Sequence, residues 1–327
     1  MALIEKQDLG FIPYWGLTVA ARRFSPAFRL KWAPRVARFG ARLWLLLSPG
    51  EREQTKRNLE LMLNGQSPPG DLAAINLSHH AAHIWNFLAI DIIPQLSHAQ
   101  LRAMSEVRGL EHLEAARAKG RGAVLLSSHS GAHGYITVAI LVAHGCPMTA
   151  VAGVEGMSVG QTEPDHRSWF YRRLVHPLRA SPRLALPFLT RGLVPDRQMA
   201  AVLQRNEALW MQGDQHLTEK EAAAETYAFP VPFLWGTAMV RSGPIRLAKM
   251  FGAPVLPTFA AQGRGSPWIV EIEKPLELRP GHSRDDVVAD MRAYLERLER
   301  RILAAPDYWS FTRHENLPRW IRPTPAG

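Results

Sequence analysis

Residues 123–134 read AVLLSSHSGAHG, an apolar run that passes directly into a turn of small and polar residues. The run at 123–126 is typical of a buried strand, and residues 135–143 favour a helix. His129 is therefore expected where a strand ends and a helix begins. In α/β folds, ligands gather at the carboxyl ends of the strands, and a histidine placed there can accept a proton near neutral pH.

Strands and helices alternate along the chain that follows. We expect strands at 148–154, 208–212, 255–260 and 268–272. We expect helices at 110–119, 169–178, 196–204, 240–251 and 283–303. Upstream the pattern favours helices alone, at 29–47, 50–63 and 71–92, separated by Pro and Gly. This order predicts an α/β fold behind a helical N-terminal segment. The expected division is a helical, basic, membrane-associating segment at 1–105, an α/β core at 106–282, and a terminal helix and tail at 283–327.

The formal charge of +10 predicts an anionic partner. The excess gathers in residues 9–50, which contain seven basic, eight aromatic and no acidic residues. Basic residues interleaved with aromatic anchors are typical of helices that lie in a membrane interface. Nucleic acid is not favoured, because no binding motif stands out and the other face of this stretch is apolar. We therefore expect an anionic membrane surface as a partner.

Several classes of protein are not favoured by the sequence. No run approaches the roughly 18 apolar residues of a spanning helix, and the start MALIEKQDLG lacks the apolar core of a secretory signal. Cys146 is the single cysteine, so no intrachain disulfide forms, which fits a reducing compartment. His79, His80 and His83 have helical spacing, but no fourth ligand is suggested and we expect no metal. A Gly-x-Ser-x-Gly elbow is absent.

Several blocks in a fixed order carry a resemblance to a known family. They are HSGAHG at 129–134, GDQH at 213–216, FPVPFLWG at 229–236, SGP at 242–244, GAPVLP at 252–257 and the tail PDYW at 306–309. Together they resemble the bacterial lipid A late acyltransferases, the lauroyl/myristoyl acyltransferase-like family of the lysophospholipid acyltransferase superfamily. The resemblance implies a glycerolipid-acyltransferase-like mixed sheet flanked by helices.

The resemblance also implies a reaction and a place for it. A fatty acyl group would move from the thioester of an acyl carrier protein or CoA to a hydroxyl, or an amine, of a membrane lipid or glycolipid. The site would be the cytoplasmic face of the bacterial inner membrane, and no cofactor beyond the acyl donor is implied. His129 would be the general base, because the pKa of an alcohol is too high for unaided attack. Backbone N–H groups of the following helix would stabilise the oxyanion, and Gly131 allows close approach there.

The motif acid of the family is absent from this chain. It lies five residues after the histidine and orients the imidazole, and here that position is Gly134. In one explanation His133, Glu155 or Asp214 substitutes for it, and the last two both follow expected strands. In another, the enzyme is slow or acylates an amine or thiol that needs less help from a base. In a third, the chain is a non-catalytic lipid-binding relative that kept the fold.

Three arginines complete the set of candidate site residues. Arg172 and Arg173 follow the aromatic residues 169–171 and are candidates to hold a phosphate of the acceptor or of the donor, because bidentate geometry favours Arg. Arg241, just before the SGP block, is a similar candidate. With Gly131 and Glu155 they form the predicted substrate-binding set.

Overall fold

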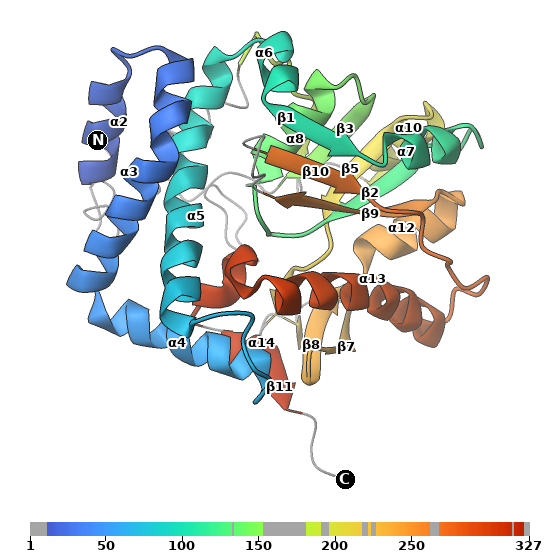
Figure 1. The fold of residues 1–327 in the computed structure, drawn as a ribbon. Helices are drawn as coiled ribbons and strands as arrows, with labels where there is room; N and C mark the ends of the chain where they lie inside the picture. Colours follow the sequence, from blue (N-terminus) through green and yellow to red (C-terminus); the bar gives the residue numbers. More distant parts are fainter. Residues whose placement is uncertain are drawn as a thin grey trace.

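The structure is a computed structural model that describes residues 12–132, 134–152, 181–190, 196–217, 222–223, 227–261, 268–315 and 317–323. A group of N-terminal helices stands beside an α/β core (Figure 1). Within these residues, no helix has the length and apolar character needed to span a bilayer.

The N-terminal helices begin where the sequence supplies caps. α3 (Pro26–Leu47) follows Ser25, whose side chain accepts a hydrogen bond from the N–H of Phe28. Asp71 caps α5 (Leu72–Ile92) in the same way. The other elements of this segment are α2 (Ile12–Ala21), α4 (Pro49–Leu63), η1 (Ile93–Gln95) and α6 (His98–Ala103). The three helices expected here are confirmed with small shifts at their ends, and α2 was not predicted.

α3 packs on α5 through small residues, and α5 in turn packs on the sheet. The alanines at the buried face of α3 are Ala33, Ala37 and Ala41. Because their side chains are short, the two helices approach closely. Trp85 of α5 stacks on Trp268 of the sheet, with ring centroids 5.7 Å apart. The helical segment and the sheet therefore share one continuous hydrophobic core.

The core of the fold is a seven-stranded mixed sheet in the order β1-β10-β9-β2-β5-β3-β4. Its strands are β1 (Ser105–Arg108), β2 (Ala123–Ser127), β3 (Met148–Ala152), β4 (Phe188–Thr190), β5 (Ala208–Gln212), β9 (Val255–Ala261) and β10 (Trp268–Ile272). All neighbouring pairs are parallel except β10 with β9. The mixed α/β fold expected from the sequence is confirmed.

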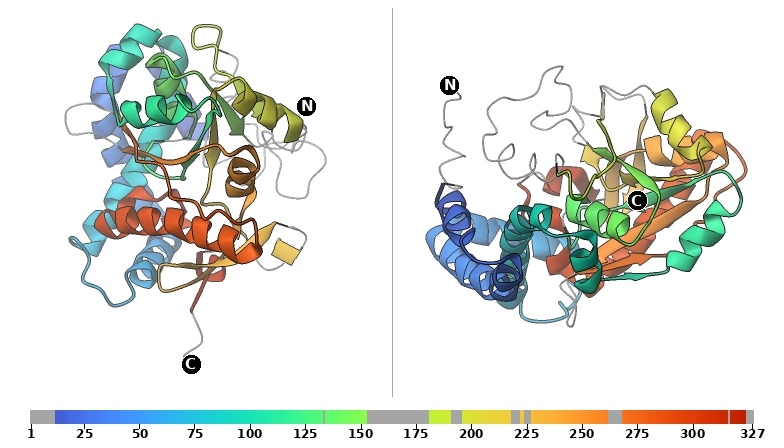
Figure 2. Two further views of the ribbon diagram at one scale, coloured as in Figure 1. Left: turned by 90° about the vertical axis from the view of Figure 1, so that its right-hand side faces the viewer. Right: turned by 90° about the horizontal axis from the view of Figure 1, so that it is seen from above.

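Helices cover both faces of this sheet, so β2 at its centre is buried along its whole length. Leu125 faces the cluster formed with α5 and α8 (Gly134–Ala143). Val124 and Leu126 point to the opposite face, as successive residues of a strand do. That face is covered by α10 (Asp196–Gln204), α12 (Gly243–Phe251) and α13 (Arg284–Ala304), while α7 (Leu110–Arg117) lies against the first. Seen from above, α2 and α3 stand on one side and the sheet on the other (Figure 2).

A second, smaller sheet lies beyond α13. It pairs β7 (Ala228–Phe233) with β8 (Gly236–Arg241), and adds β6 (His216–Leu217) and β11 (Ile321–Pro323) to β8. The block at 229–236 is thus a hairpin. The helix expected at 240–251 is wrong at its start, because Val240 pairs with Phe229 and His216 in this sheet and α12 begins only at Gly243. The apolar run there continues from a strand into a helix, and periodicity alone does not separate the two.

Candidate active site

Two neighbouring parallel strands bring the site together. Ser127 of β2 is in register with Gln212 of β5, and both strands end there. His129 and Asp214 each follow two residues later, at the same edge of the sheet. The carboxyl ends of parallel strands meet at one edge. Residues 85 apart in sequence are therefore adjacent in the fold.

His129 and Asp214 form a hydrogen-bonded pair. Nδ1 of the imidazole lies 2.8 Å from Oδ1 of Asp214, and the backbone N–H of His129 donates to Oδ2 at 2.7 Å. An ionised carboxylate only accepts, so Nδ1 carries the proton and Nε2 has its lone pair. The Asp214 side chain is 0% exposed, whereas that of His129 is 27% exposed. This arrangement suits a base whose outer nitrogen meets an incoming group.

Trp309, from the C-terminal tail, completes the environment of the carboxylate. Its Nε1–H donates to Oδ2 of Asp214 at 2.9 Å. Burial by itself raises the pKa of Asp214, but the charge of His129 and the hydrogen bonds from His129 and Trp309 outweigh it. The pKa of that carboxyl is held below its usual value. Asp214 therefore stays ionised at neutral pH and holds the imidazole in one tautomer.

Gly134 marks where this chain departs from the family pattern, and packing explains the glycine. A Cβ at this position would lie 2.7 Å from Cη2 of Trp210 and 3.3 Å from Nε2 of Gln212. Trp210 is buried on β5, so a side chain at 134 would be crowded by it. The acid that lies beside the imidazole is Asp214, from the loop after β5. Of the substitutes considered, the structure brings Asp214 to His129.

The C-terminal tail holds the turn that carries His129 by its main chain. The N–H of Ser310 donates to the carbonyl of His129 at 2.7 Å, and the N–H of Gly131 donates to that of Tyr308 at 2.9 Å. The carbonyl of Gly131 accepts from the side chain of Asn86 at 2.7 Å. Gly131 has φ +61°, and a Cβ there would lie 1.8 Å from the carbonyl oxygen of Ala260. The backbone of Gly131 thus lies close to the backbone of Ala260. A role for Gly131 in binding substrate stays a prediction.

Helix α5 fixes the tail from the other side. The hydroxyl of Ser78 donates to Asp307 Oδ2 at 2.5 Å, and Nδ1 of His79 donates to the Asp307 carbonyl at 3.0 Å. Burial lowers the pKa of His79 to about 3, so its ring is neutral at physiological pH. The described residues contain no group of three His, Cys, Asp or Glu side chains arranged for a metal ion. His79 thus joins the N-terminal segment to the tail.

Aromatic rings enclose the pair on the side of the second sheet. The ring of Phe311 lies 4.7 Å from that of His129, and His216 packs between Phe233 and Trp309 at 5.0 and 5.3 Å. Burial lowers the pKa of His216 to about 4. A neutral His216 therefore adds no positive charge beside Asp214. Sequence reasoning did not single out His216, Phe311 or Trp309, although His216 lies in the GDQH block and Trp309 in the tail block.

Of the predicted site residues not yet located, the structure describes Arg241. Nη1 of Arg241, at the end of β8, donates to Oε1 of Gln215 at 2.8 Å, next to Asp214 in sequence. Arg241 is thus tied to the loop that carries the acid. Outside the described residues lie His133, Glu155, Arg172 and Arg173.

Several known proteins are similar to this chain. A phosphatidylinositol mannoside acyltransferase of Mycolicibacterium smegmatis is 26% identical over 317 residues, which cover 96% of this chain and 91% of that protein. One from Mycobacterium tuberculosis is 26% identical over 278 residues, 83% of this chain and 78% of the relative. Among solved structures, the 1-acyl-sn-glycerophosphate (LPA) acyltransferase PlsC of Thermotoga maritima aligns with a TM-score of 0.36 and 12% identity, over 85% of this chain and 97% of that one.

The sequence profile of the family described as bacterial lipid A biosynthesis acyltransferase matches residues 9–315. That match includes the catalytic turn, the loop with Asp214 and the tail with Trp309. The chain therefore belongs to the bacterial lipid A biosynthesis acyltransferase family, and it is an acyltransferase.

Proposed function

We propose that this enzyme transfers a fatty acyl group from the thioester of an acyl carrier protein or CoA to a hydroxyl of a membrane lipid or glycolipid, with His129 as the general base. The observation that carries the proposal is the 2.8 Å hydrogen bond between His129 and the buried Asp214. With that bond in place, the histidine needs no acid at position 134. An amine acceptor, which needs less help from a base, is the alternative that the Gly134 gap first suggested.

The proposed reaction uses the acceptor itself as nucleophile. As the hydroxyl oxygen bonds to the thioester carbonyl carbon, Nε2 of His129 takes its proton, and a tetrahedral oxyanion forms. The oxyanion collapses, the carbon–sulfur bond breaks, and the imidazolium returns the proton to the departing thiolate. Asp214 remains ionised throughout and stabilises the imidazolium. The products are an ester and a free thiol, and no acyl-enzyme forms.

The acceptor that we propose is a glycosylated lipid. Two mycobacterial relatives that match most of this chain are named for acylating phosphatidylinositol mannosides. Such an acceptor combines sugar hydroxyls with a phosphate, and we propose Arg241, which bonds Gln215 beside the acid, as one cation that contacts that phosphate. Arg172 and Arg173 remain proposed for the same purpose.

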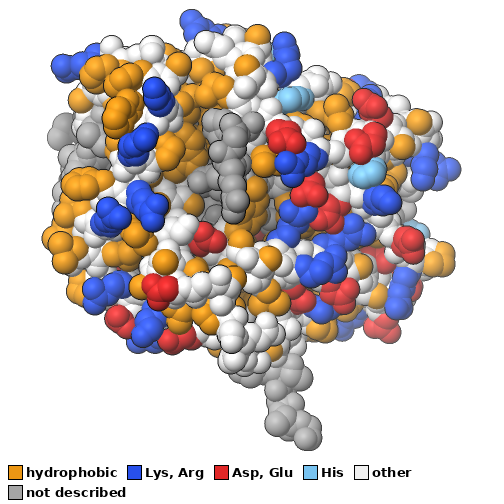
Figure 3. Space-filling view, viewed as in Figure 1, with side chains coloured by type: hydrophobic (Ala, Val, Ile, Leu, Met, Phe, Trp, Pro, Cys, Tyr) orange, Lys and Arg blue, Asp and Glu red, His pale blue; other side chains and the backbone are white. Residues whose placement is uncertain are grey.

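We also propose that α2 and α3 rest on an anionic membrane, the cytoplasmic face of a bacterial inner membrane. Large apolar side chains follow one stripe of α3 at helical spacing. They are exposed at Phe28, Trp32, Val36, Phe39, Leu43, Leu46 and Leu47, and Phe24 is exposed just before the helix. Figure 3 shows hydrophobic side chains gathered over these helices with Lys and Arg among them. A contiguous exposed apolar surface of this kind is typical of a lipid-contacting face.

The basic residues of this segment fall into two groups, one bonded to the core and one exposed. Arg22 and Arg29 both bond the buried Asp91 of α5, at 2.6 and 3.1 Å, so they fasten the helices to the core. The basic side chains exposed along the same helices are Arg23, Lys31, Arg35, Arg38 and Arg42. Each basic residue near an anionic leaflet adds about 1 kcal/mol. A cavity of about 180 Å³, lined mainly by apolar residues of α2, α3 and α5, opens beside the stripe and offers space for lipid.

Transfer of a labelled acyl chain from acyl carrier protein or CoA to a lipid extract tests the proposal. We expect turnover by the natural chain and its loss in His129→Ala. If the natural chain shows no turnover above His129→Ala while both still bind anionic vesicles, the general-base proposal fails and a lipid-binding role replaces it. Mass spectrometry of the product identifies the acylated group as an ester or an amide.

A further inference from the structure

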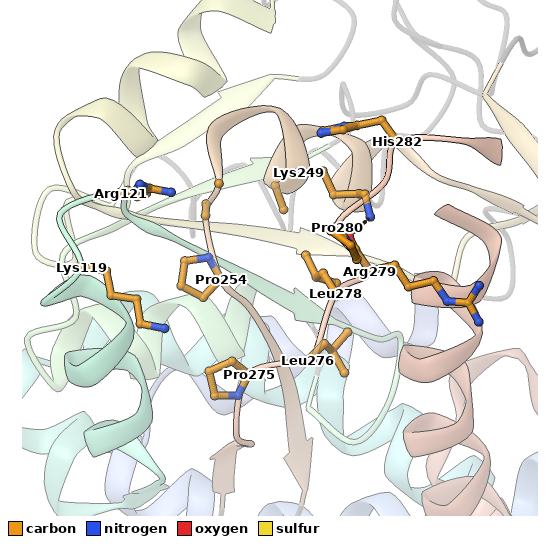
Figure 4. A pocket seen from close by; sticks show the side chains of 13 residues that line it. Lys119, Arg121, Lys249, Pro254, Pro275, Leu276, Leu278, Arg279, Pro280 and His282 are labelled. Carbon is orange, nitrogen blue, oxygen red and sulfur yellow. Dashed lines mark hydrogen bonds between the residues drawn. The ribbon is translucent and has the colours of Figure 1, made fainter. Parts of the chain in front are cut away.

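A basic pocket lies at the opposite end of the parallel strands from His129. It is formed where β2 and β9 begin, by the chain before each strand, the end of α12 and the loop 275–282 (Figure 4). The catalytic pair follows the carboxyl ends of the strands, whereas this pocket adjoins their amino ends. It therefore belongs to a separate part of the molecule.

Positive charge dominates the pocket. Its lining includes two lysines, two arginines and one histidine, and none of the described lining residues is acidic. Lys249 is paired, since its Nζ lies 2.5 Å from Asp290. Lys119 and Arg121 have no carboxylate within ion-pairing distance among the residues that the structure describes. Among the described residues, these two cations on one wall thus have no acidic partner.

The pocket is held in shape by its own contacts. Nζ of Lys249, which is 3% exposed, also donates to the carbonyl of Arg279 at 2.7 Å, and the N–H of Arg279 donates to Asp290 at 2.9 Å. This network fixes the loop 275–282 against α12 and α13. Prolines at 254, 275 and 280 restrict the rest of the rim. Little rearrangement is therefore needed before a ligand enters.

One glycine makes room for a cation of the pocket. Gly252 has φ +62°, and a Cβ there would lie 2.7 Å from Nη1 of Arg121. The guanidinium therefore crosses the backbone at the end of α12, on the pocket wall, where a side chain at 252 would displace it. Lys119 stands beside it from the same stretch of chain (Figure 4).

We propose that this pocket binds a soluble phosphorylated small molecule. Its volume of about 600 Å³ lies within the range of small-ligand sites. Lysine and arginine together are the side chains that bind phosphate, the first as a point charge and the second as a fork of donors. Leu276, Leu278 and Pro275 give the apolar wall against which an organic part of the ligand packs. The end of α12 lines the pocket, and α12 lies on the far side of the core from α2 and α3 (Figure 1), so a ligand from solution reaches the pocket while those helices face a membrane.

Calorimetric titration of the full chain with pyrophosphate tests the proposal, with ADP as a second probe that carries the same group on an organic part. We expect saturable binding of one pyrophosphate. Lys119→Gln/Arg121→Gln should weaken it by about tenfold or more, because two charged contacts are lost. Lys56→Gln/Arg57→Gln, which removes the same charge from α4, and His129→Ala should each bind within about twofold of the natural chain. Tighter binding of ADP indicates a nucleotide-like ligand, and tighter binding of pyrophosphate a smaller one.

Three results would overturn the proposal: no saturable binding of either probe, equal weakening in the α4 control, or a dependence on Lys119 and Arg121 seen only with phosphatidic acid vesicles. The last would assign the pocket to a lipid surface. Thermal unfolding of each variant verifies that it folds. Lys119→Gln alone serves where the double variant does not, since only the backbone N–H of Lys119, and not its side chain, makes a hydrogen bond within the described part of the chain.

Discussion

The charged side chains at the two ends of β2 differ in whether the protein supplies them with partners. At the carboxyl end, Asp214 is sealed from solvent and accepts hydrogen bonds from three N–H groups. At the amino end, Lys119 and Arg121 face a pocket without a carboxylate of their own among the described residues. A charge whose partners are all internal fixes one geometry, whereas a charge without an internal partner is available to a ligand. The first end suits a reaction and the second suits binding.

The largest expected effect comes from Asp214→Asn. An amide at this position presents the wrong hydrogen-bonding pattern to Nδ1, and loss of the orienting acid in a comparable triad lowers kcat about 10⁴-fold. Rates of acyl transfer under saturating donor measure the loss. Asp285→Asn, an exposed acid in the first turn of α13, is the matched control and should keep full activity. An Asp214→Asn enzyme within tenfold of the natural rate would contradict the assigned pair.

Acid should unfold the protein through its buried histidines. The pKa of His216 is lowered by burial to about 4 and that of His79 to about 3, against about 6.5 in an unfolded chain. The unfolded state then binds more protons below pH 6.5, so the free energy of unfolding falls as pH drops from 6.5 to 4, by up to about 1.4 kcal/mol per pH unit for each histidine. Urea denaturation at stepped pH measures this slope.

A variant at each end of β2 sharpens that experiment. His216→Phe should make the slope between pH 6.5 and 4 shallower, because one titrating group is gone. Arg121→Gln, at the other end of the strand, should leave the slope unchanged. Equal slopes in the natural chain and His216→Phe would mean that water reaches the ring.

Trp309→Phe should lower activity by roughly tenfold to a hundredfold. It removes a hydrogen bond to a buried charge, typically worth about 1.5–3 kcal/mol. Loss of that donor also raises the pKa of Asp214, so the acid limb of the kcat/KM profile should move to higher pH. The matched control is Trp320→Phe, in the same aromatic cluster, whose Nε1 makes no hydrogen bond in the described structure. Equal profiles for both variants would reduce Trp309 to a packing role.

Gly134→Asp tests whether the acid of the family pattern can be restored. We expect destabilisation by about 1–3 kcal/mol, because the new Cβ meets the buried ring of Trp210. Gly50→Asp, with open space around its Cα, is the control for the added charge. Combined with Asp214→Asn, Gly134→Asp should not recover turnover. Recovery would show that the two acids are interchangeable and that Trp210 on β5 can move to admit the new side chain.

The smallest effect is expected at the amino end of β2. Without ligand, Lys119→Gln/Arg121→Gln should leave kcat/KM within about twofold and stability within about 0.5 kcal/mol, as surface substitutions usually do. Steady-state rates and thermal unfolding measure both quantities. A large loss of turnover would show that Lys119 and Arg121 are needed for the reaction at the other end of β2. It would contradict the separation of the two sites.

The sequence was most informative where one strand or turn carries the signal. The run at 123–126 and the following helix were predicted, because a buried strand and an apolar helix leave local patterns. The sequence alone could not decide whether Glu155 or Asp214 is the partner of His129, because strand order and register are properties of the folded sheet. Only the pairing of Ser127 with Gln212 brings Asp214 beside His129.

Contacts between distant segments were the least predictable part of the site. Trp309 lies 95 residues after Asp214, and nothing local tells which acceptor its indole N–H reaches. The packing of Trp210 against Gly134 is of the same kind, since the glycine at first reads as a missing acid. The start of α12 was misplaced because Val240 pairs with Phe229 and His216 in the second sheet, and the apolar pattern alone does not show where that strand ends and the helix begins.

The tail that binds the catalytic turn has a consequence for biosynthesis. On the ribosome, both His129 and Asp214 are made well before Ser310 and Trp309, which supply the last main-chain and indole contacts. A nascent chain that ends at residue 300 thus carries the pair but not the contacts that complete its surroundings. On the proposed assignment of His129 and Asp214, the site is complete only once Trp309 and Ser310 have joined the fold, so we expect a chain truncated at residue 300 to be inactive.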